Sequence, residues 1–188
     1  TTGDVDLSVA LPETALLDAI ESDETNALIT PKAGAIESYA FNLHNPENLN
    51  QPHPIFGDRA VRQAIVMGFD RQAVVDDILL EQTSVPATPR SNTRWENGDL
   101  EPVPFDPEQA SAILDAAGWT LKSEGTRTRS GQELSFTVTT MSGEDPEAVL
   151  RQRVQDAFIE DMATLGIQVE AVNYPLEQLV GTDDTPGI

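Results

Sequence analysis

The amino-acid sequence predicts a mixed α/β domain, with a mixed sheet flanked by helices, and three observations support this class. Several short segments alternate apolar with polar residues, which is the period of a half-buried strand. Other segments place apolar residues at helical spacing and begin or end at capping residues. Near the carboxyl end a strand, a long helix and a strand follow in that order, which predicts two parallel strands joined by a right-handed crossover.

The amino-terminal part is expected to hold two strands and a short helix. Residues 5–11 alternate apolar and polar side chains and predict the first strand, after which Pro12 opens a short helix. Residues 36–43 alternate again and predict the second strand. Residues 44–57 contain three prolines and three asparagines, which is typical of a loop.

Two helices and a long loop are predicted next. The pattern becomes helical at Asp58 and breaks at Gly68, and Asp70 is placed to cap a second helix. The apolar side chains of that second helix are Val74, Val75, Ile78 and Leu79. Residues 84–104 contain four prolines and predict a stiff, irregular loop, and loops of this length in compact domains are usually functional or disordered.

The next helix has clear start and stop signals. Asp106 is a predicted N-cap, with Pro at the first helical position, and Gly118 is placed to end the helix in the left-handed conformation. Glycine-containing turns then bound residues 126–129, which predict an exposed strand of a hairpin.

The βαβ unit follows these turns. Residues 134–138 and 167–171 alternate as strands, and residues 150–165 have helical spacing up to Gly166.

Length and composition restrict the class of protein. The 188 residues suit one compact unit, and we assign residues 1–180 to a single α/β lobe and residues 181–188 to a flexible tail. The chain begins at Thr1 without a leader pattern, so we interpret it as a mature or excised segment. No apolar run approaches the roughly 20 residues that a membrane span requires.

The charge and the missing motifs exclude several functions. With 11 basic and 32 acidic residues the net charge is −21, so the chain repels phosphate backbones and no nucleic-acid partner is expected. Cysteine is absent, and His44 and His53 are the only histidines, so no metal site and no cofactor are expected. The glycine-containing signatures of serine hydrolases, dinucleotide enzymes and phosphate-binding loops are also missing.

Two places in the sequence suit a ligand. Arg94 and Trp95 lie together in the proline-rich loop, where a guanidinium and an aromatic face could receive an organic carboxylate. The alternative is that Trp95 packs the loop onto the body while Arg94 is solvated. Met141 and Ser142 follow the carboxyl end of a predicted strand and precede a helix, which favours anion binding, although a plain turn is the alternative.

The order of the segments resembles a known family. The chain is similar to the extracellular solute-binding proteins of the dipeptide/oligopeptide/nickel type, the substrate-binding components of ABC importers. The segments that carry the resemblance, in chain order, are YAFN (39–42), PIFGDRAVRQAI (54–65), FDRQAVV (69–75), VPATP (85–89), FDPEQA (105–110), ILDAAGW (113–119) and LGIQV (165–169). Gly68 stands where the family commonly has Ala, which predicts a looser helix junction.

The resemblance implies a function as well as a fold. It implies one lobe of a two-lobed periplasmic-binding-protein-like fold, whose first lobe is missing from this chain, and a binding function without enzymatic activity. A peptide or another small polar solute would bind in the cleft between the lobes and pass to the transmembrane subunits of an ABC permease. The protein would lie outside the cytoplasm, in the periplasm or anchored to the cell exterior. By position, the candidate ligand-binding residues are Arg94, Trp95, Met141, Ser142 and Glu144.

Two other functions stay open at this point. A chemoreceptor-coupled or sensor-coupled binding domain would use the same fold and ligand site with a different partner. A secreted hydrolase would need two convergent carboxylates, one of them with a raised pKa in a pocket.

Overall fold

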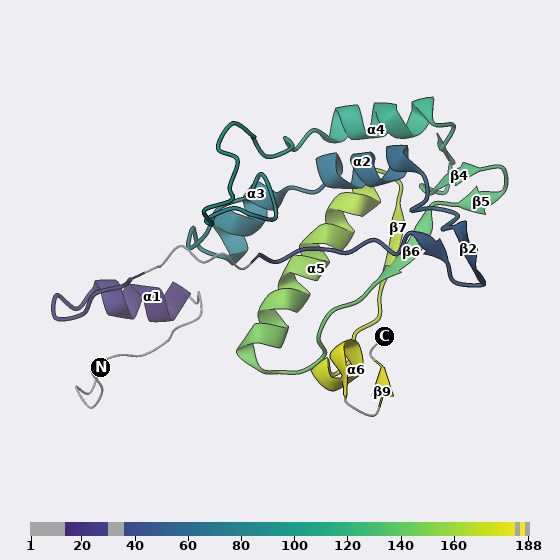
Figure 1. Ribbon diagram of the computed structural model, residues 1–188. Coiled ribbons are helices and arrows are strands. Elements are labelled where there is room, and N and C mark those ends of the chain that lie inside the picture. The colour runs from purple at the N-terminus through teal and green to yellow at the C-terminus, as the bar shows by residue number, and fades with distance from the viewer. Residues whose placement is uncertain (1–13, 30–35, 183–184, 187–188) are drawn as a thin grey trace.

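The computed structural model in Figure 1 describes residues 14–29, 36–182 and 185–186. It confirms the mixed α/β class, since helices and short strands alternate along the chain. The predicted strand over residues 5–11 and its following Pro12 lie outside the described residues. In the described part of the chain, no helix combines the length and the apolar character needed to cross a bilayer.

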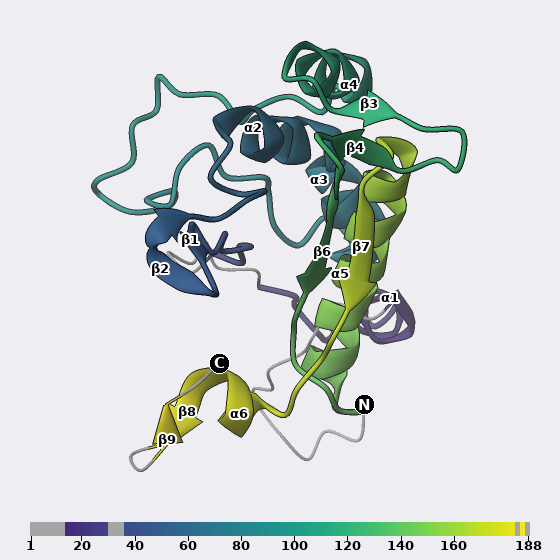
Figure 2. The same ribbon diagram turned by 90° about the vertical axis from the view of Figure 1, so that its right-hand side faces the viewer.

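The predicted βαβ unit is confirmed. Strands β6 (Ser135–Val138) and β7 (Gln168–Ala171) pair in parallel, with Ser135 opposite Gln168. Helix α5 (Pro146–Thr164) connects them and lies along one face of the pair (Figure 2). Gly166 ends this connection with a φ of 72°, a left-handed conformation that glycine adopts without steric cost.

Two neighbouring helices form a further layer of the body. Helices α2 (Arg59–Gly68) and α4 (Pro107–Ala116) lie side by side in both ribbon views, and both begin where the sequence predicts. The aspartate caps at both starts accept backbone N–H groups of the first turn. The apolar side chains that are almost wholly inaccessible belong to the core that these helices share with α5 and the strands: Val61, Leu114, Trp119, Leu134, Met162 and Ile167.

The second predicted helix is short and changes its winding. Asp70 caps α3 (Arg71–Ala73), as predicted, and the chain continues as the π-helical turn η1 (Val74–Ile78). The buried residues of that turn include Val74, Val75 and Ile78, in agreement with the predicted apolar stripe. Residues 84–104 then form turns without a helix or strand, as expected.

Short elements lie at the two ends of the described chain. Helix α1 (Thr14–Glu21) lies to one side of the body in Figure 1 and confirms the short helix predicted there. Helix α6 (Leu176–Val180) is followed by the antiparallel strands β8 (Gly181–Thr182) and β9 (Thr185–Pro186). The flexibility predicted for residues 181–188 stays a prediction.

The strand predicted over residues 36–43 is wrong. The structure describes all of these residues, and they form no strand. The alternation instead reflects aromatic burial, because the ring of Tyr39 lies against Phe69 and Phe158 and the ring of Phe41 lies against Phe56. An extended segment can therefore alternate apolar and polar residues without belonging to a β-ladder; its last carbonyl, of Leu43, accepts the His53 N–H at 2.8 Å.

The loop predicted over residues 44–57 contains a hairpin. Strands β1 (His44–Asn45) and β2 (Asn48–Pro52) pair antiparallel, with Asn45 opposite Asn48. Most of this hairpin is exposed, so it lacks the apolar alternation that marks a strand packed on a core.

The strand predicted over residues 126–129 forms, but it is not exposed throughout. Strand β4 (Arg127–Arg129) is the centre of a three-stranded antiparallel sheet with β3 (Thr120–Leu121) and β5 (Gln132–Glu133). Its first side chain, Arg127, is only 2% exposed. A sequence of alternating Thr and Arg does not reveal that one arginine is in the interior.

Arg127 is buried because acceptors surround its guanidinium. Its Nε donates to the Leu165 carbonyl at 2.7 Å, and Nη1 donates to the Trp119 carbonyl at 2.7 Å. Nη1 also contacts the Asp115 carboxylate at 2.5 Å, and Nη2 donates to the Ser111 hydroxyl at 2.5 Å. The cation thus joins the ends of α4 and α5, where unpaired carbonyls favour positive charge.

The junction at Gly68 is closely packed, so the predicted looseness is wrong. Gly68 is buried at the end of α2, and a Cβ placed there would lie 2.3 Å from Cδ1 of Leu165. The missing side chain therefore lets α2 approach the end of α5.

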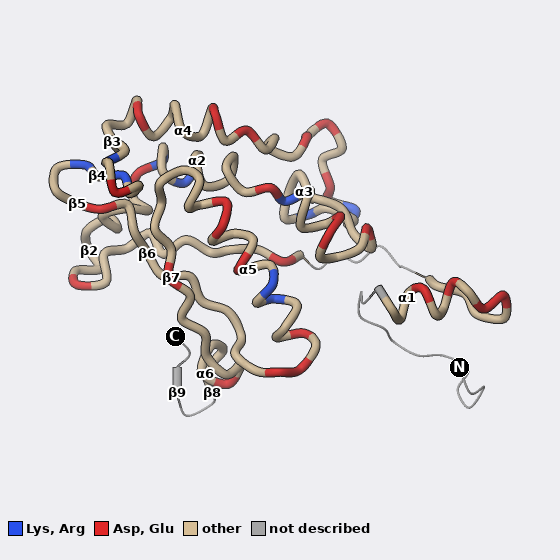
Figure 3. The backbone as a smooth tube through the Cα atoms, turned by 180° about the vertical axis from the view of Figure 1, so that it is seen from behind, with Lys and Arg blue, Asp and Glu red and all other residues tan. Residues whose placement is uncertain are grey.

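Acidic residues are distributed over most elements, as Figure 3 shows, whereas basic residues are few.

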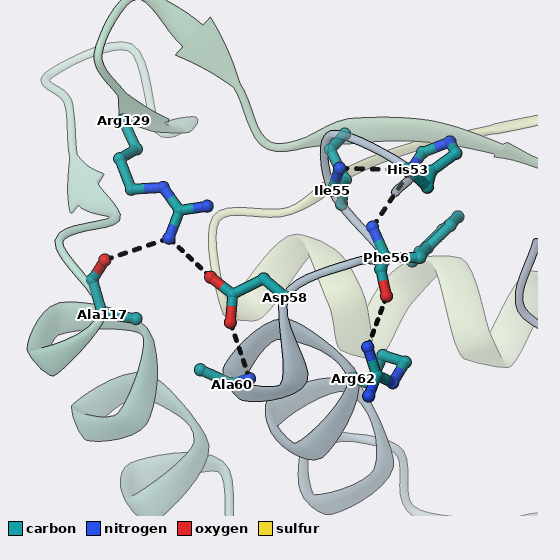
Figure 4. A network of polar contacts seen from close by, with 8 residues as sticks. All are labelled: His53, Ile55, Phe56, Asp58, Ala60, Arg62, Ala117 and Arg129. Carbon is teal, nitrogen blue, oxygen red and sulfur yellow. Dashed lines mark hydrogen bonds and ion pairs between the residues drawn. The ribbon is translucent and has the colours of Figure 1, made fainter. Parts of the chain in front are cut away.

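One ion pair joins Asp58 to Arg129 at 2.5 Å and is drawn in Figure 4. Burial acts to raise the pKa of Asp58, but the hydrogen bonds from Arg129 and from the Ala60 N–H outweigh it and hold that pKa below its usual range. The pair connects the start of α2 to the β3–β4–β5 sheet.

The turn before α2 depends on a neutral imidazole, also shown in Figure 4. His53 Nδ1 accepts the N–H groups of Ile55 at 3.1 Å and Phe56 at 3.0 Å, and its ring stacks on Phe56 with 4.8 Å between centroids. Burial lowers the pKa of His53, because it disfavours the charged ring.

Replacing the buried arginine should destabilise the fold. We expect Arg127→Met to lower the free energy of unfolding by about 3 kcal/mol, because buried carbonyls lose their donors. Urea unfolding followed by circular dichroism measures this change. Arg153→Met removes an exposed arginine from α5 and serves as the control, with a change within about 0.5 kcal/mol. Equal losses in the two variants would show that Arg127 contributes nothing specific.

The stability of the fold should depend on the protonation of His53. Its folded pKa lies below the ordinary value of 6.5, so the unfolded chain binds the proton more readily. The contribution is therefore complete above that value and is lost as the pH falls through the folded pKa. We expect the free energy of unfolding to decrease as the pH falls below 6.5, and to decrease less in His53→Asn. The control His44→Asn should keep the wild-type slope, and an unchanged slope in His53→Asn would contradict the assignment.

Candidate ligand-binding site

The predicted residues Met141 and Ser142 lie at the carboxyl end of the parallel strand pair. Beyond the strands, the Tyr174 N–H donates to the Thr140 carbonyl at 3.1 Å, and the Ser142 N–H donates to the Tyr174 carbonyl at 2.8 Å. Met141 and Tyr174 form an isolated parallel bridge at the same place. The pairing thus continues past both strands and holds the backbone of the loop in a defined position.

The three predicted side chains of this loop differ in accessibility. Met141 is buried, Ser142 is half-buried and Glu144 is exposed. Met141 therefore belongs to the floor of the loop, whereas the hydroxyl of Ser142 and the carboxylate of Glu144 are the groups within reach of solvent.

Two side-chain amides, which the sequence analysis missed, hold this loop in place. Gln155 is 1% exposed, and its amide exchanges two hydrogen bonds of 2.8 Å with the amide of Asn173. The same groups also bind the backbone, since Gln155 donates to the Val138 carbonyl at 3.2 Å and Asn173 accepts the Thr140 N–H at 3.0 Å. A glutamine beside the apolar stripe of the predicted helix was the signal for this network.

Helix α5 supplies a second support one turn earlier. The Gln152 side chain donates to the carbonyls of Met141 at 3.0 Å and Gly143 at 3.2 Å. Because both glutamines project from one helix, the position of α5 determines the position of the loop.

The start of α5 does not favour an anion, contrary to the preference expected for this turn. The Asp145 carboxylate accepts the Ala148 N–H at 3.1 Å and so occupies the helix N-terminus. Glu144 adds further negative charge beside it, whereas Glu147 is paired with Arg151 at 3.0 Å. The electrostatics of this loop therefore favour a positively charged group of a ligand.

The second predicted pair lies in the 84–104 loop. Arg94 stacks on Trp95, with its Cζ 4.4 Å from the ring centroid, and Trp95 is 65% exposed. The packing of Trp95 onto the body, one part of the alternative, is therefore wrong, whereas its other part is confirmed because Arg94 is exposed. Among the described residues, no carboxylate forms an ion pair with Arg94.

The loop itself is tied by local hydrogen bonds. The Thr93 hydroxyl donates to the Arg90 carbonyl at 2.6 Å, and the Asn92 N–H donates to the Glu96 carboxylate at 2.9 Å. These bonds and the prolines give the Arg94–Trp95 stack a defined backbone without help from a helix or strand.

The structure brings each predicted group together but not the two groups with one another. Met141, Ser142 and Glu144 share one loop, and Arg94 and Trp95 form one stack. Within the described ranges, no hydrogen bond, ion pair or ring contact joins the two loops, which lie in different parts of Figure 2. No cluster of three or more metal-binding side chains occurs in the described part of the chain.

Comparison with known proteins places these features in a family. The model for bacterial extracellular solute-binding proteins, family 5 Middle, matches residues 1–185. Protein XP55 of Streptomyces lividans is 34% identical over 171 residues, which cover 89% of this chain and 28% of that protein. The chain thus spans less than a third of that relative's length.

Solved structures show the same likeness. The oligopeptide-binding protein AppA from Bacillus subtilis, in complex with a nonapeptide, matches with a TM-score of 0.61 and 26% identity over 67% of this chain and 25% of its own. NikA from Brucella suis, in complex with Fe(III)-EDTA, matches with a TM-score of 0.59 and 27% identity over 66% of this chain and 25% of its own.

Removing the buried amide pair should loosen the loop more than it unfolds the protein. In Gln155→Leu, Asn173 and the Val138 carbonyl lose their donors, and we expect a loss of about 2 kcal/mol in the free energy of unfolding. The amides of Thr140 and Ser142 should exchange with deuterium at least about tenfold faster. Gln168→Leu, at an exposed position of β7, is the matched control. Unchanged exchange in Gln155→Leu would show that the amide pair does not hold the loop.

Proposed function

Since the chain belongs to the bacterial extracellular solute-binding proteins, family 5, we propose that it forms one lobe of a protein that captures a small polar solute and delivers it to an ABC permease. The match of the family model over residues 1–185 is the observation that carries this proposal. The family description also locates the protein outside the cytoplasm.

The proposal includes a further lobe of the same protein. Tight capture of a polar solute requires surfaces on two sides, because a ligand on one open face keeps most of its contact with water. The chain covers 28% of protein XP55 and 25% of AppA, which leaves room in such proteins for a second surface. Binding would then favour a closed arrangement of two lobes over an open one.

Within this lobe, the two loops would supply groups of opposite character. Arg94 would bind a ligand carboxylate and Trp95 an apolar side chain, while Glu144 would bind an amino group. Ser142 would add a hydroxyl, and the buried Met141 would shape the floor. A peptide carries all three kinds of group, and AppA was solved with a nonapeptide, so we favour a peptide as the solute.

Binding rather than catalysis fits the titratable groups. Burial raises the pKa of the Asp161 carboxyl, and the Asp70 N–H donates to it at 2.8 Å. Asp161 lies in the last turn of α5, at the opposite end from Ser142 and Glu144. The neighbouring Asp70 carboxylate also raises this pKa, but Asp70 caps α3. Neither acid lines the pocket formed by Phe69 and Arg71, so the two do not provide the acid pair in a pocket that a hydrolase needs.

Native mass spectrometry of the protein purified from its natural host tests the proposal. We expect an additional mass in the native spectrum that disappears on denaturation and resolves to short peptides. A metal chelate would keep solute capture and replace the solute class. No adduct, together with no binding after incubation with peptide mixtures, would contradict solute capture by this protein.

Variants of the proline-rich loop test the proposed residues. In that protein, Arg94→Ala and Trp95→Ala should each weaken peptide binding about tenfold or more, because a charge partner or an aromatic contact is lost. Isothermal titration calorimetry measures the change. Arg90→Ala removes an exposed arginine from the same loop and should leave the affinity unchanged. Equal affinities in all three variants would remove the loop from the binding site.

A further inference from the structure

A pocket lies where the 84–104 loop begins and ends, and the five candidate ligand-binding residues are not part of its lining. It has a volume of about 270 Å³ and lies between the two ends of the loop and the junction of α2 with α3. Its walls are mainly apolar and include Phe69, Val85, Val103 and Phe105. The charged side chain in its lining is Arg71.

The guanidinium of Arg71 lacks a counter-ion. One of its terminal nitrogens donates to the Val103 carbonyl, while its Nε is buried and has no hydrogen-bond partner. No carboxylate of the described residues forms an ion pair with it, although the chain has 32 acidic residues. Arg71 is half-buried, and this burial lowers the pKa of its guanidinium because it disfavours the charged form.

The two nearest acids in the sequence are engaged elsewhere. Asp70 precedes Arg71, but its Oδ1 accepts a backbone N–H at the start of α3 at 2.9 Å. Asp106 follows Phe105, but its Oδ1 accepts a backbone N–H at the start of α4 at 2.8 Å. Both carboxylates cap helices, so the pocket keeps a positive centre inside an apolar wall.

We propose that this pocket binds a small organic monocarboxylate, whose carboxylate pairs with Arg71 and whose apolar body lies against Phe69 and Phe105. The guanidinium of Arg71 lines the pocket and bonds the Val103 carbonyl through one terminal nitrogen, so the N–H groups of the other can pair with a carboxylate. The aromatic walls suit a flat or branched hydrocarbon. The volume lies just below the range of about 300–1,000 Å³ typical of drug-sized ligands, which limits the ligand to roughly the size of benzoate. A single guanidinium in a strongly acidic protein does not suit a polyanion.

The proposal is independent of solute capture by the two loops. Arg94 and Trp95 lie in the middle of the 84–104 loop, whereas the pocket is formed where the loop begins and ends. A bound acid would contact Val85 at the start of the loop and Val103 at its end, and so hold the two ends of the loop together.

Titration of the ¹⁵N-labelled 188-residue chain with benzoate tests the proposal. We expect saturable shifts of the amides of Phe69, Arg71, Val85, Val103 and Phe105. Benzyl alcohol has the same ring without the charge and should bind at least about tenfold more weakly. Equal binding of the two compounds, or no shift with benzoate, would overturn the proposal.

Three variants distinguish the pocket from a general effect of charge. Arg71→Gln should abolish the benzoate shifts, and Arg59→Gln, which removes the same charge from an exposed position of α2, should preserve them. Because Arg71 also holds the Val103 carbonyl, Val85→Phe provides a second test that fills the pocket and leaves the arginine in place. Undiminished benzoate binding in either Arg71→Gln or Val85→Phe would overturn the assignment.

Discussion

The guanidinium of Arg127 determines how the layers of this fold meet. Its hydrogen bonds reach the carbonyls of Trp119 and Leu165, which follow the last turns of α4 and α5, and the side chains of Ser111 and Asp115. A buried cation is tolerated only when its donors are satisfied, so the two helix ends must come together around it. The close approach of α2 to the end of α5 requires the same arrangement.

Helix α5 connects the Arg127 site to the candidate loop. Its last residues lie beside Arg127, while Gln152 and Gln155 near its middle hold the loop with Ser142. A helix that is fixed at one end and holds a loop from its middle connects the stability of the core to the geometry of the candidate site. Placement of the loop on such an element keeps its polar groups organised before a ligand arrives.

Features that depend on neighbouring residues were predicted correctly from the sequence. Features that depend on residues far apart in the sequence were not. The caps at Asp70 and Asp106 and the βαβ unit are encoded by neighbouring residues, and all are confirmed. The burial of Arg127 and the aromatic packing of residues 36–43 depend on partners far along the chain. The βαβ order places the candidate loop at the carboxyl end of the strands. The sequence offered a signal only for Gln155, beside the apolar stripe of the helix, whereas its partner Asn173 is identified by the tertiary structure.

The extended segment over residues 36–43 has a mechanical consequence. Side chains hold it to the body, through the rings of Tyr39 and Phe41 and the ion pair between Glu37 and Arg151 at 2.9 Å. A force applied at its amino-terminal end would load these attachments one after another, as in peeling, whereas a strand within a ladder resists by shearing many bonds at once. The segment would therefore detach at low force while the core around α5 stays folded, so tension entering from this side is absorbed before it reaches the candidate site.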